Sequence, residues 1–258
     1  MIKDELGQRM KKYENAEVGE SLPRKVPVII RIDGKAFHTF TKGFRKPFDD
    51  VLIKSMEETM KYLCKNIQGC IFGYTQSDEI SLVLIDYQNE ESDAWFGYRI
   101  QKISSIAASM VTFAFNKNFS AFVDEYNCDF NSSAVQANWY LAAVEKGALF
   151  DARCFSLSRE EVTNYILWRQ FDARRNSILS LGQAHFNNNR LHKKTCLDVV
   201  EMLKEEKQID WKTLPNNYKF GSCCYRKNEI WQIDREQGLL MGVDRALLDN
   251  LVVKGEQK

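Results

Sequence analysis

The sequence of 258 residues lacks several features that would assign it to common protein classes. It has no apolar run long enough to cross a membrane, and its charged N-terminus, MIKDELGQRMKKYE, has no signal-peptide core. Its seven cysteines are irregularly spaced, and the adjacent Cys223 and Cys224 do not have zinc-ligand spacing. We therefore expect a cytoplasmic protein with reduced thiols and no membrane association.

The chain also lacks an excess of either charge. It has 36 basic and 35 acidic residues, a net charge of +1, so the whole molecule does not attract nucleic acid and any RNA surface must be a local patch. There is no internal repeat and no low-complexity linker. The length allows one large domain or two small ones.

The stretch Val26–His38, VPVIIRIDGKAFH, reads as a buried strand that ends at Asp33 and Gly34. A carboxylate at the end of such a strand is costly to bury without a partner. The glycine allows the backbone to turn sharply and leaves its carbonyl open to a ligand. A carboxylate beside a free carbonyl suits Mg²⁺. Taken alone, however, Asp-Gly is more often an ordinary turn.

The stretch Cys70–Asp86 reads as two apolar strands joined by a polar turn at Gln76-Ser77-Asp78. We expect this hairpin to place Asp78 beside Asp33. Because neighbouring strand residues face opposite sides, Asp78 and Glu79 are not expected to bind the same metal. Two strand-end aspartates that hold two Mg²⁺ ions beside a nucleotide form the geometry of two-metal nucleotidyl transfer.

These residues resemble a known family. RIDGKAFH with KPFDD, and then GYTQSDEISLVL, are similar to the tRNA-His guanylyltransferase family and its Thg1-like proteins. FGYRIQK, FDAR, YILWRQFDARRNS and KFGSCCYRK follow in the family's order, so the resemblance spans roughly residues 5–235. Family members are 3′-to-5′ polymerases that add nucleotides to the 5′ end of tRNA.

The resemblance implies an α+β fold with a polymerase-palm-like, largely antiparallel sheet backed by helices. A smaller helical C-terminal part is expected beside it. We expect residues 1–135 to form the palm-like catalytic core and residues 136–258 to complete it and contribute tRNA contacts, within one compact unit. Local patterns favour helices over roughly residues 94–116 and from Ser158 onward, whereas residues 117–148 show no clear pattern.

The resemblance also implies the roles of individual residues. Asp33 and Asp78 are expected to be catalytic and, with the Gly34 carbonyl, to bind two Mg²⁺ ions. The nucleotide, GTP or ATP, is expected to contact Lys35, Ala36, Phe37, His38, Lys46, Asp49, Ser77, Arg99 and Lys102. Asp49 or Asp50 is also expected to cap the next helix.

Some of these residues have simpler explanations when their spacing alone is considered. His38 in an aromatic loop is more often a packing residue. Arg99 and Lys102 are three residues apart and share one helix face, which is usually a solvated basic face. The resemblance implies instead that this pair binds triphosphate.

The resemblance further implies tRNA as a partner, contacted by Arg174, Arg175, Asn176 and Lys219, and a homotetramer built as a dimer of dimers. The chain departs from the family at one motif. Eukaryotic tRNA-His guanylyltransferases carry His-Ile-Asn-Asn where this chain has Arg174-Arg175-Asn176-Ser177. That histidine motif accompanies addition of guanosine without a template. Its absence favours the Thg1-like branch, which repairs truncated tRNA 5′ ends by template-dependent addition.

Three alternatives remain at this point. A tRNA-His guanylyltransferase would add a single guanosine to its tRNA. A nucleotidyl cyclase also uses a palm with two acids, but it has no need of the WRQ-to-RRNS stretch. A non-catalytic RNA-binding protein would keep the basic residues but would not need Asp33, Asp78, Arg99 and Lys102 together.

Overall fold

The computed structural model describes residues 6–13, 19–89, 91–130, 132–240 and 245–254. At its centre is a six-stranded sheet in the order β4-β1-β3-β2-β5-β6, in which all neighbouring strands are antiparallel. The α+β class and the antiparallel palm-like sheet are therefore confirmed. The strands are β1 Val28–Gly34, β2 Cys70–Gln76, β3 Glu79–Leu84, β4 Phe150–Ser156, β5 Ser222–Lys227 and β6 Ile230–Asp234.

Strict alternation of side chains along β1 and β3 gives the sheet two apolar faces. Ile30 and Leu82 belong to the large core on one face, whereas Ile29 and Val83 belong to a separate core on the other. A strand that is buried on both faces reads as a continuous apolar run, which is the pattern that VPVIIRI shows.

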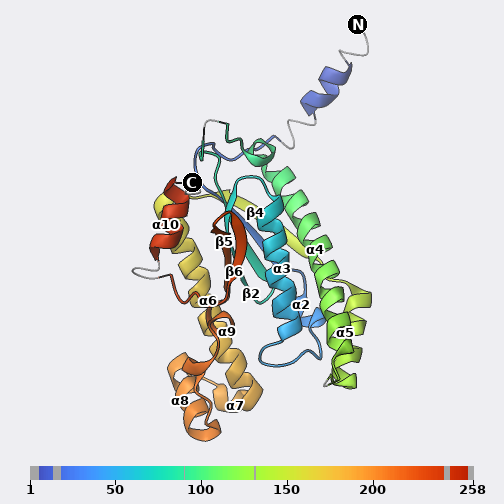
Figure 1. Cartoon of the computed structure of the whole chain (residues 1–258), viewed down its shortest axis with the longest axis vertical. Helices are drawn as coiled ribbons and strands as arrows, with labels where there is room; N and C mark the ends of the chain where they lie inside the picture. Colours follow the sequence, from blue (N-terminus) through green and yellow to red (C-terminus); the bar gives the residue numbers. More distant parts are fainter. Residues whose placement is uncertain (1–5, 14–18, 90, 131, 241–244, 255–258) are drawn as a thin grey trace.

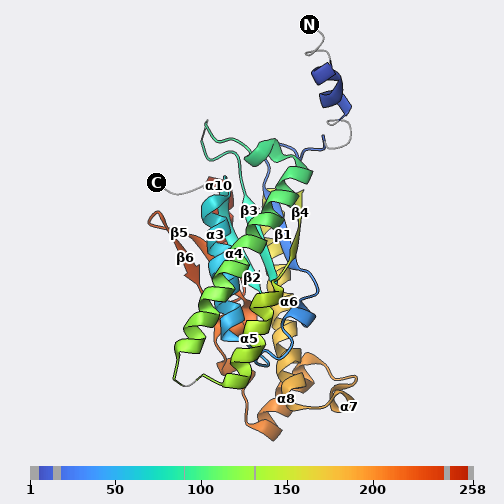
Figure 2. The same cartoon turned by 90° about the vertical axis from the view of Figure 1, so that its right-hand side faces the viewer.

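Two long helices cover the first face. They are α3, Asp50–Asn66, and α4, Ile100–Cys128, and they pack against each other as well as on the sheet (Figure 2). Asp49 begins α3 because its carboxylate accepts a hydrogen bond from the Leu52 N–H. The short helices α2, Phe37–Phe40, and η1, Trp95–Tyr98, precede α3 and α4, and α5, Ala134–Lys146, follows α4.

The second face is covered by α6, Arg159–His185, and α10, Arg245–Lys254. Val162 and Ile166 of α6 pack with Leu248 of α10 in the core of that face. After crossing the sheet, α6 continues beyond it and carries the helical C-terminal part at its end (Figure 1).

The helical C-terminal part has a core of its own, in which Leu181 of α6, Leu203 and Trp211 are buried together. Its other elements are α7 Asn188–Leu191, α8 Cys196–Lys207, η2 Trp211–Thr213 and α9 Asn216–Phe220. The expected division at residue 135 falls within α5, and β4, β5 and β6 all come from the second segment. Among the described helices, none combines the length and the apolarity needed to span a membrane.

A buried ion pair joins α6 to the sheet. The Arg169 guanidinium donates to both carboxylate oxygens of Glu79, at 2.7 and 2.8 Å, and Arg31 donates to the same carboxylate at 2.8 Å. The side chains of Arg169 and Glu79 are only 5% and 6% exposed. Burying two charges is costly, so the pair stabilises the fold only because each charge compensates the other.

Replacing Arg169 with alanine should lower the free energy of unfolding by about 3–5 kcal/mol, because it leaves the buried Glu79 carboxylate without its main partner. Urea denaturation followed by circular dichroism measures this change. Arg175→Ala, at an exposed position of the same helix, is the control and should cost less than about 0.5 kcal/mol. A loss below about 1 kcal/mol for Arg169→Ala would contradict the buried pair.

Candidate active site

The two predicted acids meet where β1 ends against the tip of the β2–β3 hairpin. Asp33 is the second-to-last residue of β1, and Asp78 lies in the two-residue turn after β2. Ser77 makes this turn possible by adopting a left-handed conformation, with φ 51°. The Gly34 N–H donates to the Asp78 carbonyl at 3.1 Å and holds the two segments together. The sequence prediction that Asp33 and Asp78 lie side by side agrees with this geometry.

The two acids lie close enough for their charges to interact, and the nearby Arg153 is bonded to Asp151 rather than to either of them. Burial raises the pKa of Asp78, the charge of Asp33 raises it further, and a 3.0 Å hydrogen bond from the Ser77 hydroxyl lowers it in part. In the part of the chain that the structure describes, no ion pair reaches either carboxylate. A bound cation would therefore remove an unfavourable interaction at this point.

Glu79, the next residue, has a different environment. Its carboxylate is occupied by Arg169 and Arg31 on the α6 face of the sheet. Burial raises its pKa and outweighs the opposing effect of the two arginines. This arrangement agrees with the expectation that Asp78 and Glu79 do not share a metal.

A cavity of about 560 Å³ opens from the acid pair toward α2 and the loop that follows it. Seven of the residues that were expected to bind nucleotide or metal line it together with the two acids. They are Gly34, Ala36, Phe37, His38, Lys46, Asp49 and Ser77. Lys35 belongs to the same turn, where its N–H donates to the Leu149 carbonyl at 2.8 Å.

Asp49 lines the cavity, but its hydrogen bonds give it a structural role. Its carboxylate accepts hydrogen bonds from Leu52 N–H at 3.0 Å, Arg45 N–H at 2.9 Å and the Tyr140 hydroxyl at 2.7 Å. The residue is 5% exposed. These contacts begin α3 and fix the preceding loop. Direct binding of nucleotide by Asp49 stays a prediction, and it would require these hydrogen bonds to break.

Gly34 is needed for a reason other than the expected sharp turn. The residue ends β1 in ordinary strand pairing opposite Phe150, and the left-handed residue of this turn is Ala36, with φ 52°. A Cβ atom at position 34 would lie 2.2 Å from the Phe37 ring. The glycine is therefore needed because the Phe37 ring occupies the space of a side chain at this position, and the backbone does not turn there.

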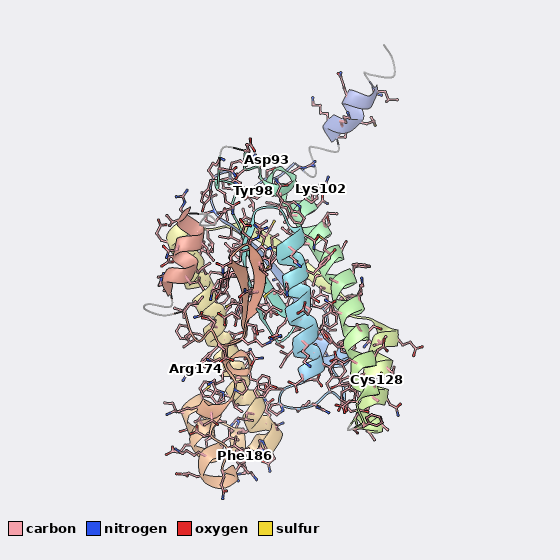
Figure 3. The ribbon with its side chains drawn as sticks, viewed as in Figure 1. Asp93, Tyr98, Lys102, Cys128, Arg174 and Phe186 are labelled. Atoms are coloured by element: carbon pink, nitrogen blue, oxygen red, sulfur yellow. The ribbon has the colours of Figure 1, made fainter. Side chains whose placement is uncertain are left out.

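Arg99 and Lys102 lie apart from the acids. They flank the start of α4, where the Ile100 carbonyl contacts Cys154. In the sheet, Cys154 is the partner of Ile30 in β1. Asp33 lies three residues farther along β1 than Ile30, which corresponds to about 10 Å between the start of α4 and the acid. Lys102 packs over the Phe96 ring at 4.7 Å, at the end of the molecule far from Arg174 (Figure 3). The structure therefore does not place this pair in the cavity of its own chain.

The expected tRNA contacts divide into two groups. Arg175 and Asn176 are exposed on α6, and Arg174 lies over the Trp211 ring at 5.7 Å. Lys219 is 7% exposed, and its ammonium donates to the Lys212 carbonyl at 2.8 Å. The assignment of Lys219 as a tRNA contact is therefore wrong for this structure, because the side chain is buried in the helical C-terminal part.

The sequence reasoning missed two features beside the acids. Arg45 lines the cavity and stacks over Tyr126 at 5.2 Å, and the basic loop around Lys46 was the available signal. On the α6 face, Arg31 and Arg153 are paired across β1 and β4, next to Asp33. The alternation of Arg31 with Asp33 could have indicated that these two residues share one face, whereas the position of Arg153 depends on the pairing of β1 with β4.

The donor set consists of hard oxygen ligands of the kind that suit Mg²⁺. Among the described residues, no group of three or more histidines, cysteines or acids is arranged to hold a metal. Magnesium commonly takes one or two carboxylates and completes its shell with water and substrate phosphates. Asp33, Asp78 and the Gly34 carbonyl provide such an incomplete set of hard oxygen ligands.

Comparisons with known proteins give consistent matches. A family model described as tRNAHis guanylyltransferase matches residues 7–158. A bacterial tRNA(His) guanylyltransferase (Thg1)-like protein in complex with ATP is 39% identical, with a TM-score of 0.83, and the match covers 96% of this chain and 99% of that one. Another such structure, in complex with GTP, is 35% identical, with a TM-score of 0.74 and the same coverage. A probable tRNA(His) guanylyltransferase of Dictyostelium discoideum is 25% identical, over 96% of this chain and 92% of that protein.

Gly34→Ala should lower the free energy of unfolding by about 1–3 kcal/mol, because the added methyl group displaces the packed Phe37 ring. Chemical denaturation of Gly34→Ala, Phe37→Leu and the double variant measures the coupling between the positions. Since the smaller leucine leaves room for the methyl group, the double variant should lose less stability than the sum of the single losses. Additive losses would contradict the steric explanation.

Asp78→Asn should raise the thermal unfolding midpoint at pH 7 in metal-free buffer, because it removes a charge that burial and Asp33 disfavour. Added Mg²⁺ should raise the midpoint of the unaltered protein through binding to the folded state, and this response should be lost in the variant. Differential scanning fluorimetry measures both effects. Asp124→Asn, at an exposed site on α4, is the matched control and should change neither value. A lower midpoint with an unchanged Mg²⁺ response would contradict the site.

Proposed function

The chain belongs to the tRNA-His guanylyltransferase family and is a nucleotidyltransferase, and from this premise we propose that it repairs truncated tRNA 5′ ends. The reaction is template-dependent, 3′-to-5′ addition of nucleotides, with GTP and ATP among the substrates. The observation that carries the proposal is the Asp33–Asp78 pair, which has no ion pair among the described residues and opens onto a cavity bordered by Arg45 and Lys46.

Two observations support the repair reaction over addition of a single guanosine. The histidine motif of the eukaryotic enzymes is replaced by Arg174-Arg175-Asn176-Ser177. Ser177 is buried and accepts a hydrogen bond from the Trp211 indole, so this part of the segment has a packing role. The chain is also more similar to the bacterial Thg1-like proteins, at 39% and 35% identity, than to the Dictyostelium protein, at 25%.

Asp33, Asp78 and the Gly34 carbonyl would hold the two Mg²⁺ ions of this reaction. When bound, Mg²⁺ lowers the pKa of the attacking hydroxyl and offsets charge on the phosphoryl oxygens. The chain positions the other groups. The Ser77 hydroxyl orients the Asp78 carboxylate at 3.0 Å. Lys46 and Arg45, at the cavity border, carry the positive charge that a triphosphate requires.

The chemistry needs no protein nucleophile. The 3′-hydroxyl of the incoming nucleotide attacks the activated 5′ phosphorus of the RNA, and a new phosphodiester bond forms. The bond to the leaving pyrophosphate, or to AMP where the end was adenylylated, breaks at the same phosphorus. The hydroxyl proton passes to solvent. Catalysis is then positioning and charge stabilisation at the acid pair.

We also propose a homotetramer, a dimer of dimers. Exposed apolar side chains on α4 and α5, among them Phe113 and Trp139, support an association surface. The separation of Arg99 and Lys102 from the acids agrees with this proposal, because a neighbouring subunit offers them a route to a triphosphate that their own chain does not.

The test uses a 5′-triphosphorylated tRNA that lacks its first nucleotide, incubated with Mg²⁺ and each single nucleoside triphosphate. The opposing base on the 3′ side is varied, and the 5′ end is followed at single-nucleotide resolution. We expect the added nucleotide to pair with the opposing base in every case. Addition of guanosine regardless of that base would instead support the tRNA-His guanylyltransferase activity and contradict the repair proposal.

Asp33→Ala and Asp78→Ala should each reduce this addition below detection, because each removes a ligand of the metal ions. Asp151→Asn tests whether loss of any acid at this end of the sheet abolishes addition. Asp151 of β4 lies opposite Asp33 of β1, but its carboxylate is bonded to Arg153. We expect the Asp151 variant to retain addition. Full activity of either alanine variant would contradict the metal assignment.

A further inference from the structure

Trp168 presents an exposed indole ring on α6, on the sheet face that carries Asp33. The residue is 53% exposed, whereas large aromatic residues are usually mostly buried. The Arg169 guanidinium lies 4.5 Å from the ring centroid, the Arg31 guanidinium lies 5.9 Å from it, and the Tyr165 ring lies 6.0 Å away. These neighbours hold the ring in place from several sides. The result is a flat, positioned aromatic surface on a rigid helix.

The ring lies close to the acid pair. Arg31 and Asp33 are alternate residues of β1, so they share one face of the sheet and lie about 7 Å apart. Because Trp168 packs on Arg31, its indole is a short distance along the strand from the Asp33 carboxylate. A nucleotide whose phosphate lies at Asp33 can therefore extend its own base toward this ring.

The charges around Trp168 indicate what kind of group it binds. The Glu79 carboxylate accepts hydrogen bonds from Arg31 and Arg169, and the Asp172 carboxylate accepts a hydrogen bond from Arg169 at 2.9 Å. Both arginines are therefore already paired with carboxylates beside the ring. What remains open is an aromatic face, and nucleobases stack on such faces.

Arg153 adds a polar boundary to this surface. Its position opposite Arg31 places it on the same face of the sheet as Arg31, and its ion pair with Asp151, at 2.8 Å, joins two side chains that are more than half exposed. Such an exposed pair opens at little cost. The surface thus combines a stacking ring with one cation that a nearby phosphate can attract, a combination that is typical of RNA-binding sites.

We propose that Trp168 stacks on the 5′-terminal nucleobase of the RNA substrate and so positions the 5′ phosphate at Asp33 and Asp78. This inference rests on the proposed function and names a residue that recognises its substrate. Stacking is tolerant of sequence because every base has an aromatic face. A ring of this kind therefore suits an enzyme that must accept whichever base ends a shortened RNA.

The test measures binding of a 5′-triphosphorylated acceptor-stem hairpin, labelled at its 3′ end, by fluorescence anisotropy. It compares RNA with an intact 5′-terminal residue and RNA in which that residue lacks its base. We expect the unaltered protein to bind the abasic RNA roughly 10- to 100-fold more weakly. Trp168→Ala should weaken binding of intact RNA to a similar extent. The variant should bind both RNAs with equal affinity, because without the indole ring a terminal base has no surface on which to stack.

Two variants serve as controls. Trp168→Phe keeps an aromatic face and should retain most of the discrimination between the two RNAs. Ile230→Ala removes an apolar side chain that is 64% exposed on the edge strand β6, and it should leave RNA binding unchanged. In a nucleotide-addition assay, Trp168→Ala should raise the KM for RNA and leave the KM for nucleoside triphosphate unaltered.

The outcomes separate this inference from the proposed function. Equal affinity of the unaltered protein for intact and abasic RNA overturns the inference, and this comparison does not depend on whether any variant folds. If the protein discriminates between the RNAs but adds nucleotides without a template, the stacking inference stands and the repair proposal fails. Templated addition without discrimination overturns the stacking inference alone.

Discussion

The hydrogen bond from the Gly34 N–H to the Asp78 carbonyl fixes how the end of β1 meets the tip of the β2–β3 hairpin. Backbone pairing between β1 and β3 brings Asp33 opposite Glu79, and the left-handed Ser77 then places Asp78 beside that end. The acid pair is thus held by strand register and turn geometry, while the side chains themselves repel. The fold bears this cost because the surrounding sheet is buried on both faces.

The fold separates the charges at this end of the sheet into two environments. Glu79 forms ion pairs with Arg169 and Arg31 on the α6 face, whereas Asp33 and Asp78 form no ion pair with any of the described residues. Asp78 lies in the turn and Glu79 begins β3, and of these two consecutive acids only Glu79 is bonded to arginines. Asp33 lies opposite Glu79 and shares its face of the sheet, so these two acids differ because Arg31 and Arg169 are bonded to Glu79.

Local alternation and turn chemistry were sufficient to predict β1, the β2–β3 hairpin and the cap at Asp49, and the ends of these strands led to the predicted adjacency of the two acids. The palm-like sheet was predicted from the family resemblance, and β5 and β6 were not predicted as its strands because their pairing depends on distant residues. Residues 117–148 were not predictable, since α4 continues to Cys128 and α5 packs on it through tertiary contacts. The burial of Lys219 also depends on distant partners, namely the rings of Trp211 and Phe220. The position of Arg99 and Lys102 was missed for a related reason: helical spacing predicts a shared face but not which end of the sheet that face occupies.

One helix links the catalytic sheet to the helical C-terminal part. The 27 residues of α6 extend over about 40 Å, and Arg169 anchors the helix to the sheet near its middle. The first half of α6 packs in the core on the sheet through Val162 and Ile166, and its second half packs in the core of the helical C-terminal part through Ile178 and Leu181. Because this one helix is packed in both cores, a displacement of either core is passed directly to the other, and the helical C-terminal part is expected to move with the sheet as one body.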